Sequence, residues 1–240
     1  MRLSSTFFDC AESSLIVSFG PHYSKELSLA ILDLSHRLET AQLPGLVESI
    51  PALCSLTVFY DPLTLSKEVL TDVIEDLCEA ANSAPAVGRL WEVPVVYGGE
   101  HGPDLDSVAE LAGIAANAAV QLHASEVYHV YMLGFLPGFA YLGDLPDALR
   151  LPRRTTPRAR VPAGSVAIAS DMTAVYPLES PGGWHLIGST PLILWDMARN
   201  AEPLLKPGDR VRFHPVAAAE ADYLKDQIAK GWQPQPVEAA

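Results

Sequence analysis

The fold of the second half of the chain is decided by the stretch Val161-Pro-Ala-Gly-Ser-Val-Ala-Ile-Ala-Ser-Asp-Met-Thr-Ala-Val-Tyr-Pro177, in which short β-prone runs lie between proline and glycine residues. Runs of this kind at short intervals are typical of a compact β-barrel or sandwich. Comparable runs occur on both sides, at Val127–Met132, Trp184–Ile187, Leu192–Trp195 and Val211–Phe213. We therefore predict a compact β-barrel or sandwich for this part of the chain.

Three helices are predicted in the same part of the chain. One begins near Asp104, because Ser107 and Glu110 have the spacing of a capping box and Gly113 follows the apolar run. Two others are expected over residues 117–123 and 217–230.

The first ninety residues alternate β-prone and helical patterns. Strands are predicted at Ser14–Phe19, Leu56–Tyr60 and Gly88–Tyr97, and helical apolar periods cover residues 27–38 and 70–81. Pro94 indicates an edge or a bulge in the third strand. The chain is thus predicted to be α+β, with a small βαββαβ-like α/β domain over residues 1–88 and a β-barrel domain over residues 89–240.

The charge of the chain is strongly negative and unevenly distributed. Its 240 residues include 16 basic and 29 acidic side chains, a net charge of −13, which disfavours nucleic acid and anionic lipid as partners. Residues 1–149 hold 5 basic and 20 acidic side chains, whereas residues 150–240 hold 11 and 9. Five arginines then fall close together, namely Arg150, Arg153, Arg154, Arg158 and Arg160.

Such a run of arginines is commonly a solvated face. Guanidinium groups, however, bind carboxylate and phosphate oxygens in bidentate geometry. In this acidic chain the arginine cluster is a local concentration of positive charge. We hypothesise that two or more of these arginines bind a small anionic substrate, with Arg153, Arg154 and Arg158 as the candidates.

A second candidate site is the loop Tyr97-Gly-Gly-Glu-His-Gly-Pro-Asp104. Glu100 and His101 could act as acid and base, since imidazole exchanges protons near neutral pH and a neighbouring carboxylate raises its basicity. The alternative is structural, with Asp104 as a helix N-cap and His101 as a solvated side chain.

Several site classes lack a sequence signal. Three cysteines without a paired spacing suggest neither a disulfide framework nor a zinc site, and we expect no metal. No run approaches the ~18 apolar residues of a membrane span, so we expect a cytoplasmic protein without membrane contact. A Walker-type loop and a recognisable biotin-attachment lysine are also missing from the sequence.

The loops rich in proline and glycine carry a family resemblance. The motifs are Tyr97–Leu105, Gly134-Phe-Leu-Pro-Gly-Phe139, Pro152-Arg-Arg154, Val161-Pro-Ala-Gly-Ser165, Ser180-Pro-Gly-Gly-Trp184 and Gly188-Ser-Thr-Pro191. In these motifs the chain resembles the family of 5-oxoprolinase B subunits, also known as the KipI or allophanate hydrolase subunit 1 family, which is related to the carboxyltransferase region of urea carboxylase.

The resemblance implies a cyclophilin-like β-barrel from about residue 89 and a role in opening 5-oxoproline to glutamate. ATP would be the co-substrate, and the partners would be a KipA-like C subunit, together with an A subunit. It also implies that anionic groups meet the three arginine candidates and the loops at Gly164, Ser165, Gly182 and Gly183. The remaining motif residues form candidate partner loops, namely Phe135, Pro137, Gly138, Phe139 and Trp184.

Two positions depart from the family pattern. Ser189 stands where the family pattern has arginine, and Ser170 stands where it has glycine, so ligand choice can differ here. Two alternative functions stay open: half of a biotin-dependent, urea-type carboxyltransferase, and a KipI-like inhibitor of a sensor histidine kinase. The protein is expected to be inactive without its partners.

Overall fold

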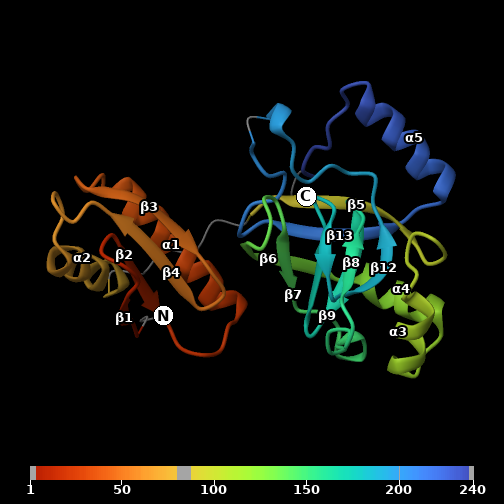
Figure 1. The fold of residues 1–240 in the computed structure, drawn as a ribbon, viewed down its shortest axis with the longest axis horizontal. Helices are drawn as coiled ribbons and strands as arrows, with labels where there is room; N and C mark the ends of the chain where they lie inside the picture. Colours follow the sequence, from red (N-terminus) through yellow and green to blue (C-terminus); the bar gives the residue numbers. More distant parts are fainter. Residues whose placement is uncertain (1–3, 80–87, 200, 238–240) are drawn as a thin grey trace. The chain divides into compact units, whose positions relative to one another are not determined.

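The computed structural model describes residues 4–79, 88–199 and 201–237 of the chain (Figure 1). The chain divides into two compact units, Met1–Val87 and Gly88–Ala240. Each unit has a hydrophobic core of its own, so each is described by itself.

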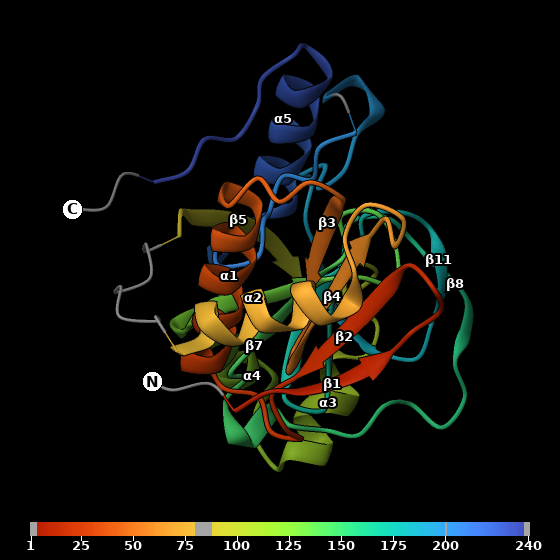
Figure 2. The same cartoon turned by 90° about the vertical axis from the view of Figure 1, so that its left-hand side faces the viewer.

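In the N-terminal unit two helices cover one face of a four-stranded antiparallel sheet (Figure 2). The sheet order is β1-β2-β4-β3, and Leu15 and Val17 on β2 lie beside Val58 and Leu56 on β4 beneath the helices. The elements are β1 (Thr6–Asp9), β2 (Ser14–Ser18), α1 (Lys25–Thr40), β3 (Leu46–Pro51), β4 (Ser55–Tyr60) and α2 (Lys67–Glu79).

The α+β class and the barrel are confirmed, but the order of elements in the N-terminal unit is ββαββα rather than the predicted βαββαβ. Strands β1 and β3 lie at the two edges of the sheet and leave apolar side chains in solvent, with Phe8 54% and Val47 68% exposed. Their sequences therefore lack the alternation that predicts a half-buried strand. The strand predicted at Gly88–Tyr97 exists and belongs to the barrel.

Seven strands close the barrel of the C-terminal unit in the order β10-β7-β6-β13-β5-β12-β9. Strands β5 and β13 pair in parallel, and the other neighbours pair antiparallel. The barrel strands are β5 (Leu90–Tyr97), β6 (Val127–Leu133), β7 (Ala140–Gly143), β9 (Ser165–Ala169), β10 (Met172–Val175), β12 (His185–Ser189) and β13 (Arg210–Pro215). Strands β8 (Arg158–Val161) and β11 (Ser180–Gly182) form a separate two-stranded sheet.

Three helices belong to the same unit: α3 (Leu105–Ala112), α4 (Ala116–Ser125) and α5 (Ala218–Ala229). All three were expected from the sequence, but the capping box that predicted α3 is wrong. Asp104 occupies the N-cap position without a capping hydrogen bond from its side chain, and Ser107 lies inside the helix. The carboxylate of Asp104 has other partners, which are described below.

The strand predicted at Leu192–Trp195 is also wrong. Leu192 and Leu194 are buried in the barrel core, whereas Ile193 is 44% exposed, so the segment alternates like a strand. It belongs to neither sheet of this unit, because its one ladder contact is an isolated bridge from Trp195 to Pro203.

The carboxylate of Asp209 links β5 and β13, the first and last strands of the barrel in the sequence. This buried carboxylate accepts hydrogen bonds from the backbone N–H and guanidinium of Arg89, the indole N–H of Trp91 and the backbone N–H of Lys206, at 2.7–3.2 Å. Arg89 precedes β5 and Asp209 precedes β13, so this cluster anchors the parallel register that pairs Leu90 with Arg210. Charge-assisted hydrogen bonds of this kind are among the strongest in proteins.

His123 on α4 is fully buried, and both of its ring nitrogens are hydrogen-bonded. The hydroxyl of Thr173 donates its single proton to the Ala167 carbonyl at 3.1 Å, so it accepts from Nε2–H of His123 at 2.8 Å. Nδ1 is then free to accept from the hydroxyl of Tyr97 at 2.7 Å. This chain of hydrogen bonds fixes a neutral imidazole, and burial lowers the pKa of His123 to about 3.

Lowering the pH below about 6.5 should destabilise the barrel through His123. The unfolded chain binds a proton at this residue and the native chain does not, so the free energy of unfolding falls by about 1.4 kcal/mol per pH unit until the native pKa is reached. Urea unfolding followed by tryptophan fluorescence measures this unit alone, because all four tryptophans lie in it: Trp91, Trp184, Trp195 and Trp232.

The variant His123→Gln should lose this part of the pH dependence, whereas His36→Gln, at an exposed histidine of the other unit, should retain it. An unchanged slope in His123→Gln would contradict the assignment of a neutral buried imidazole.

Candidate functional site

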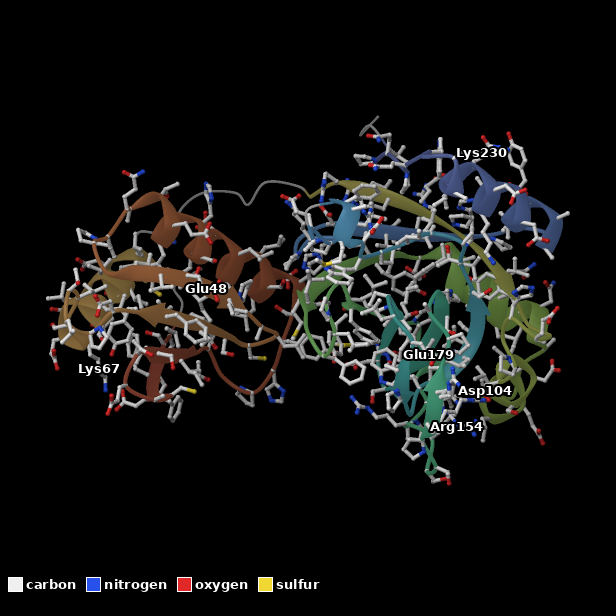
Figure 3. The ribbon with its side chains drawn as sticks, turned by 45° about the horizontal axis from the view of Figure 1, so that its top comes forward. Glu48, Lys67, Asp104, Arg154, Glu179 and Lys230 are labelled. Atoms are coloured by element: carbon white, nitrogen blue, oxygen red, sulfur yellow. The ribbon has the colours of Figure 1, made fainter. Side chains whose placement is uncertain are left out.

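Asp104 is the centre of a buried ion-pair cluster, and Figure 3 shows it beside Arg154 in the barrel unit. Its side chain is 5% exposed. The carboxylate accepts hydrogen bonds from Nη1 of Arg154 at 2.9 Å and from both terminal nitrogens of Arg158 at 2.7 and 2.8 Å. The backbone N–H of Leu186 donates to the same carboxylate at 2.7 Å, and the Asp104 N–H donates to the Leu186 carbonyl at 2.9 Å. One side chain therefore joins the start of α3, the loop before β8 and strand β12.

The environment of Asp104 stabilises its charged form. Burial alone would raise the pKa of Asp104, but hydrogen bonds from Arg158 and the Leu186 N–H, with the charges of Arg158 and Arg154, hold it below the ordinary carboxyl value. The stabilisation is therefore present above the ordinary carboxyl pKa and is lost as the pH falls through the lowered native value.

The five clustered arginines are largely neutralised by carboxylates of the same chain. Arg153 has no ion-pair partner among the described residues, and its guanidinium lies 6.0 Å from the centre of the Trp184 ring. Of the three arginines predicted to bind an external anion, two thus bind an internal one. The pairs are Arg150 with Asp147, Arg154 and Arg158 with Asp104, and Arg160 with Glu179.

The predicted partner loops converge on an aromatic cluster. Phe139 is buried and meets the rings of Tyr176, Trp184 and Phe135 edge-on, with centroids 5.2–5.9 Å apart. Phe135 is 61% exposed and has a positive φ of 62°, a conformation that costs energy in a side chain of this size. The turn through Pro137 and Gly138 closes with a hydrogen bond from the Phe139 N–H to the Leu136 carbonyl at 3.0 Å.

Two of the loop amides predicted to bind an anion are already engaged. The Gly164 N–H donates to the Tyr176 carbonyl at 2.8 Å, and the Ser165 N–H donates to the Pro162 carbonyl at 3.3 Å. Glycine is required at 164, where φ is +82° and a Cβ would lie 2.6 Å from the Thr190 carbonyl oxygen.

Gly182 and Gly183 pack around the segment Arg150–Arg160, which carries the five clustered arginines and which we call the arginine loop. A Cβ at Gly182 would overlap the hydroxyl of Tyr176, and the Gly183 carbonyl accepts the Arg154 N–H at 2.8 Å. These glycines thus allow close packing around the residues that hold Asp104.

A cleft of about 450 Å³ opens in the barrel unit between loops and the last helix. We call this the α5 cleft. Its chemistry comes from His101 in the β5–α3 loop, Ser189 at the end of β12, and Asp222 and Lys225 on α5, with Gly164 and Trp195 also lining it.

His101 and Ser189 meet inside the α5 cleft, with Nδ1 of His101 2.8 Å from Oγ of Ser189. Glu100, the other predicted catalytic residue, is exposed and does not line this cleft. The structure therefore places the imidazole in a concave site and leaves the neighbouring carboxylate outside it. None of the three arginine candidates lines the cleft either.

Sequence reasoning missed Trp195, Asp222 and Lys225 as cleft residues. Trp195 lay in a predicted strand, and the other two lay in a helix without a recognisable motif. Ser189 did carry a signal, as one of the two departures from the family pattern.

Two further classes of site were searched in the described residues. Within residues 4–79, 88–199 and 201–237, no group of three or more His, Cys, Asp or Glu side chains is placed to hold a metal ion. Over the same ranges, none of the helices combines the length and the apolar character needed to span a membrane.

Replacing Asp104 by Asn should lower the free energy of unfolding of the barrel unit by roughly 2–4 kcal/mol, because two partly buried guanidinium groups lose their counter-charge. The matched control is Arg160→Gln, which breaks an ion pair whose side chains are 77% and 52% exposed. That change should cost less than about 1 kcal/mol. Urea unfolding followed by tryptophan fluorescence compares them, and equal small losses would show that the Asp104 cluster is no stronger than a surface pair.

Comparison with known sequences places this fold in a family. Residues 5–205 match the family described as carboxyltransferase domain, subdomain C and D. The chain is 40% identical over 223 residues to the 5-oxoprolinase B subunit of Bacillus subtilis, covering 88% of this chain and 92% of that protein. It is 44% identical over 207 residues to the 5-oxoprolinase B subunit of Escherichia coli O157:H7, covering 85% and 93%.

Solved structures agree with this placement. TTHA0988 superposes with a TM-score of 0.76 at 40% identity over 85% of this chain, which spans 40% of that longer chain. The urea amidolyase of K. lactis shares the fold, with a TM-score of 0.83 at 20% identity over 99% of this chain and 16% of its own. The chain therefore belongs to the carboxyltransferase-domain family and, within it, to the family of 5-oxoprolinase B subunits.

Proposed function

We propose that this protein is the B subunit of an ATP-dependent 5-oxoprolinase, which opens 5-oxoproline to L-glutamate in the cytoplasm together with an A subunit, and with a KipA-like C subunit. The observation that carries the proposal is the identity of 39–44% to three proteins named as the B subunit of 5-oxoprolinase, each aligned over 92–94% of its own length. In ring opening, water adds to the lactam carbonyl carbon, the ring C–N bond breaks and the leaving nitrogen takes a proton. Such chemistry requires a proton-exchanging group beside the amide.

Among the described residues, His101 is our first candidate for that group. It lies in the α5 cleft, and its ring is held by Ser189 at 2.8 Å. Imidazole exchanges protons readily near neutral pH. Glu100 is the second candidate, and its exposed position outside the cleft supports a smaller contribution.

Two features of the described residues disfavour a triphosphate site in this chain. Arg154 and Arg158 are paired with Asp104, and the carboxylate of Asp222 lines the α5 cleft together with Lys225. We therefore assign ATP to one of the partner proteins and propose that the isolated chain turns nothing over.

Reconstitution tests the function directly. The full chain, purified and mixed with the A subunit, and with a KipA-like C subunit, should support ATP hydrolysis that depends on 5-oxoproline. Each mixture that omits one of the three proteins should be inactive. A folded and assembled complex without this activity would overturn the proposal, and turnover by this chain alone would overturn its dependence on partners.

Variants in the same assay test the site. His101→Gln should lower kcat by about 100-fold, because acid–base groups contribute of that order or more. Glu100→Gln should lower it less, and Glu110→Gln, an exposed change on α3, is the control that should not lower it. Full activity of Glu100→Gln would remove that residue from the site.

The exposed ring of Phe135 is our candidate contact for the KipA-like partner. The strained backbone of this residue holds an apolar ring in solvent, an arrangement typical of contact residues. Phe135→Ser should weaken association about 30-fold, corresponding to about 2 kcal/mol for an interface hot spot, as measured by calorimetry. Leu111→Ser, which removes a side chain that is 65% exposed elsewhere in the unit, should leave the affinity unchanged.

The two alternative functions give other outcomes. Half of a urea-type carboxyltransferase would act on urea with a biotinylated partner, and a KipI-like regulator would lower autophosphorylation of a sensor histidine kinase. The urea amidolyase of Lachancea kluyveri, 23% identical over 97% of this chain and 14% of its own length, favours the first of these over the second.

A further inference from the structure

We propose that the α5 cleft binds a small cyclic amide that carries one carboxylate, with Lys225 pairing with the carboxylate and the His101–Ser189 pair bonding to the ring amide. The inference rests on the proposed function, which supplies a substrate of this class. It goes further by assigning the substrate to one cleft of this chain and giving Lys225, His101 and Ser189 each a part in its recognition.

Lys225 is the cation available to such a ligand. It lines the cleft from α5 and forms no ion pair with any other residue that the structure describes. A lysine ammonium acts as a compact point charge, which suits a single carboxylate. Asp222 also lines the cleft, and its repulsion of a ligand grows with each further negative charge on that ligand.

The His101–Ser189 pair suits an amide. An uncharged imidazole and a hydroxyl each offer a donor and an acceptor, and the 2.8 Å hydrogen bond between them uses one of each. The pair therefore keeps both a donor and an acceptor for a ligand, which matches the C=O and N–H of a lactam. A carboxylate has no proton to donate and would use only the donor.

The apolar part of the cleft suits a planar ring. The indole N–H of Trp195 is spent on the Ala201 carbonyl at 3.1 Å, so this residue offers the cleft an aromatic surface rather than a donor. A volume of about 450 Å³ falls within the roughly 300–1,000 Å³ of small-molecule sites. Lys225 lies beyond residues 5–205, so the match to the family does not reach this wall of the cleft.

Calorimetric titration of the full chain with two ligands tests the assignment. The ligands are 5-oxoproline and 2-pyrrolidinone, which is the same lactam without the carboxylate. The chain should bind 5-oxoproline saturably, and Lys225→Gln should weaken that binding at least about 10-fold while leaving 2-pyrrolidinone unaffected. Ser189→Ala should weaken both ligands to the same degree.

The matched control is Lys230→Gln, at a lysine just after α5 (Figure 3). This residue is not among those that line the cleft. The affinity of this variant for 5-oxoproline should equal that of the unaltered chain. Binding of 5-oxoproline should also weaken with added salt in the unaltered chain and lose this dependence in Lys225→Gln.

The inference is overturned if the folded chain shows no saturable binding of 5-oxoproline, or if Lys225→Gln binds it as tightly as the unaltered chain. These failures differ from failure of the proposed function. An active reconstituted complex in which this chain does not bind 5-oxoproline would contradict only the cleft assignment. Saturable, Lys225-dependent binding in a complex without activity would contradict only the proposed function.

Discussion

The carboxylate of Asp104 fixes the loop end of the barrel, because it holds α3, the arginine loop and β12 at one point. Without it, Arg154 and Arg158 would be neighbouring, partly buried cations with no counter-charge. The same contact sets the cleft. His101 lies shortly before Asp104 in its loop and Ser189 shortly after Leu186 on β12, so the link between Asp104 and Leu186 brings the imidazole to the hydroxyl.

Local sequence patterns predicted the helices and strands that bury one face or one apolar run. They did not predict features that depend on residues far away in the sequence. The apolar runs of the barrel predicted β9, β10, β12 and β13, whereas Leu192–Trp195 alternated without being part of a sheet. Asp104 looked like an N-cap from its neighbours, because the arginines that hold it are 50 and 54 residues away. The arginine cluster was visible in the sequence, but its counter-charges were not.

Residue types in the sequence pointed to only some of the residues that line the α5 cleft. His101 stood out as an imidazole in a glycine-rich loop and Ser189 as a departure from the family pattern, whereas Lys225 and Trp195 carried no local signal. The family match over residues 5–205 includes the Asp104 contacts and stops before α5. The family match thus covers the ion-pair cluster and the loop residues of the cleft but not its α5 wall, so a substitution on α5 need not disturb Asp104 or its partners.

The parallel pairing of β5 with β13 has a kinetic consequence during synthesis. Leu90 pairs with Arg210, and so large a separation closes slowly compared with the hairpins of the N-terminal unit. Strand β5 therefore has an unpaired edge during the time in which the N-terminal unit forms its core. Pro94, in the middle of that strand, has no N–H to offer and interrupts the row of donors. The growing chain thus carries its own protection against pairing with a neighbouring nascent strand.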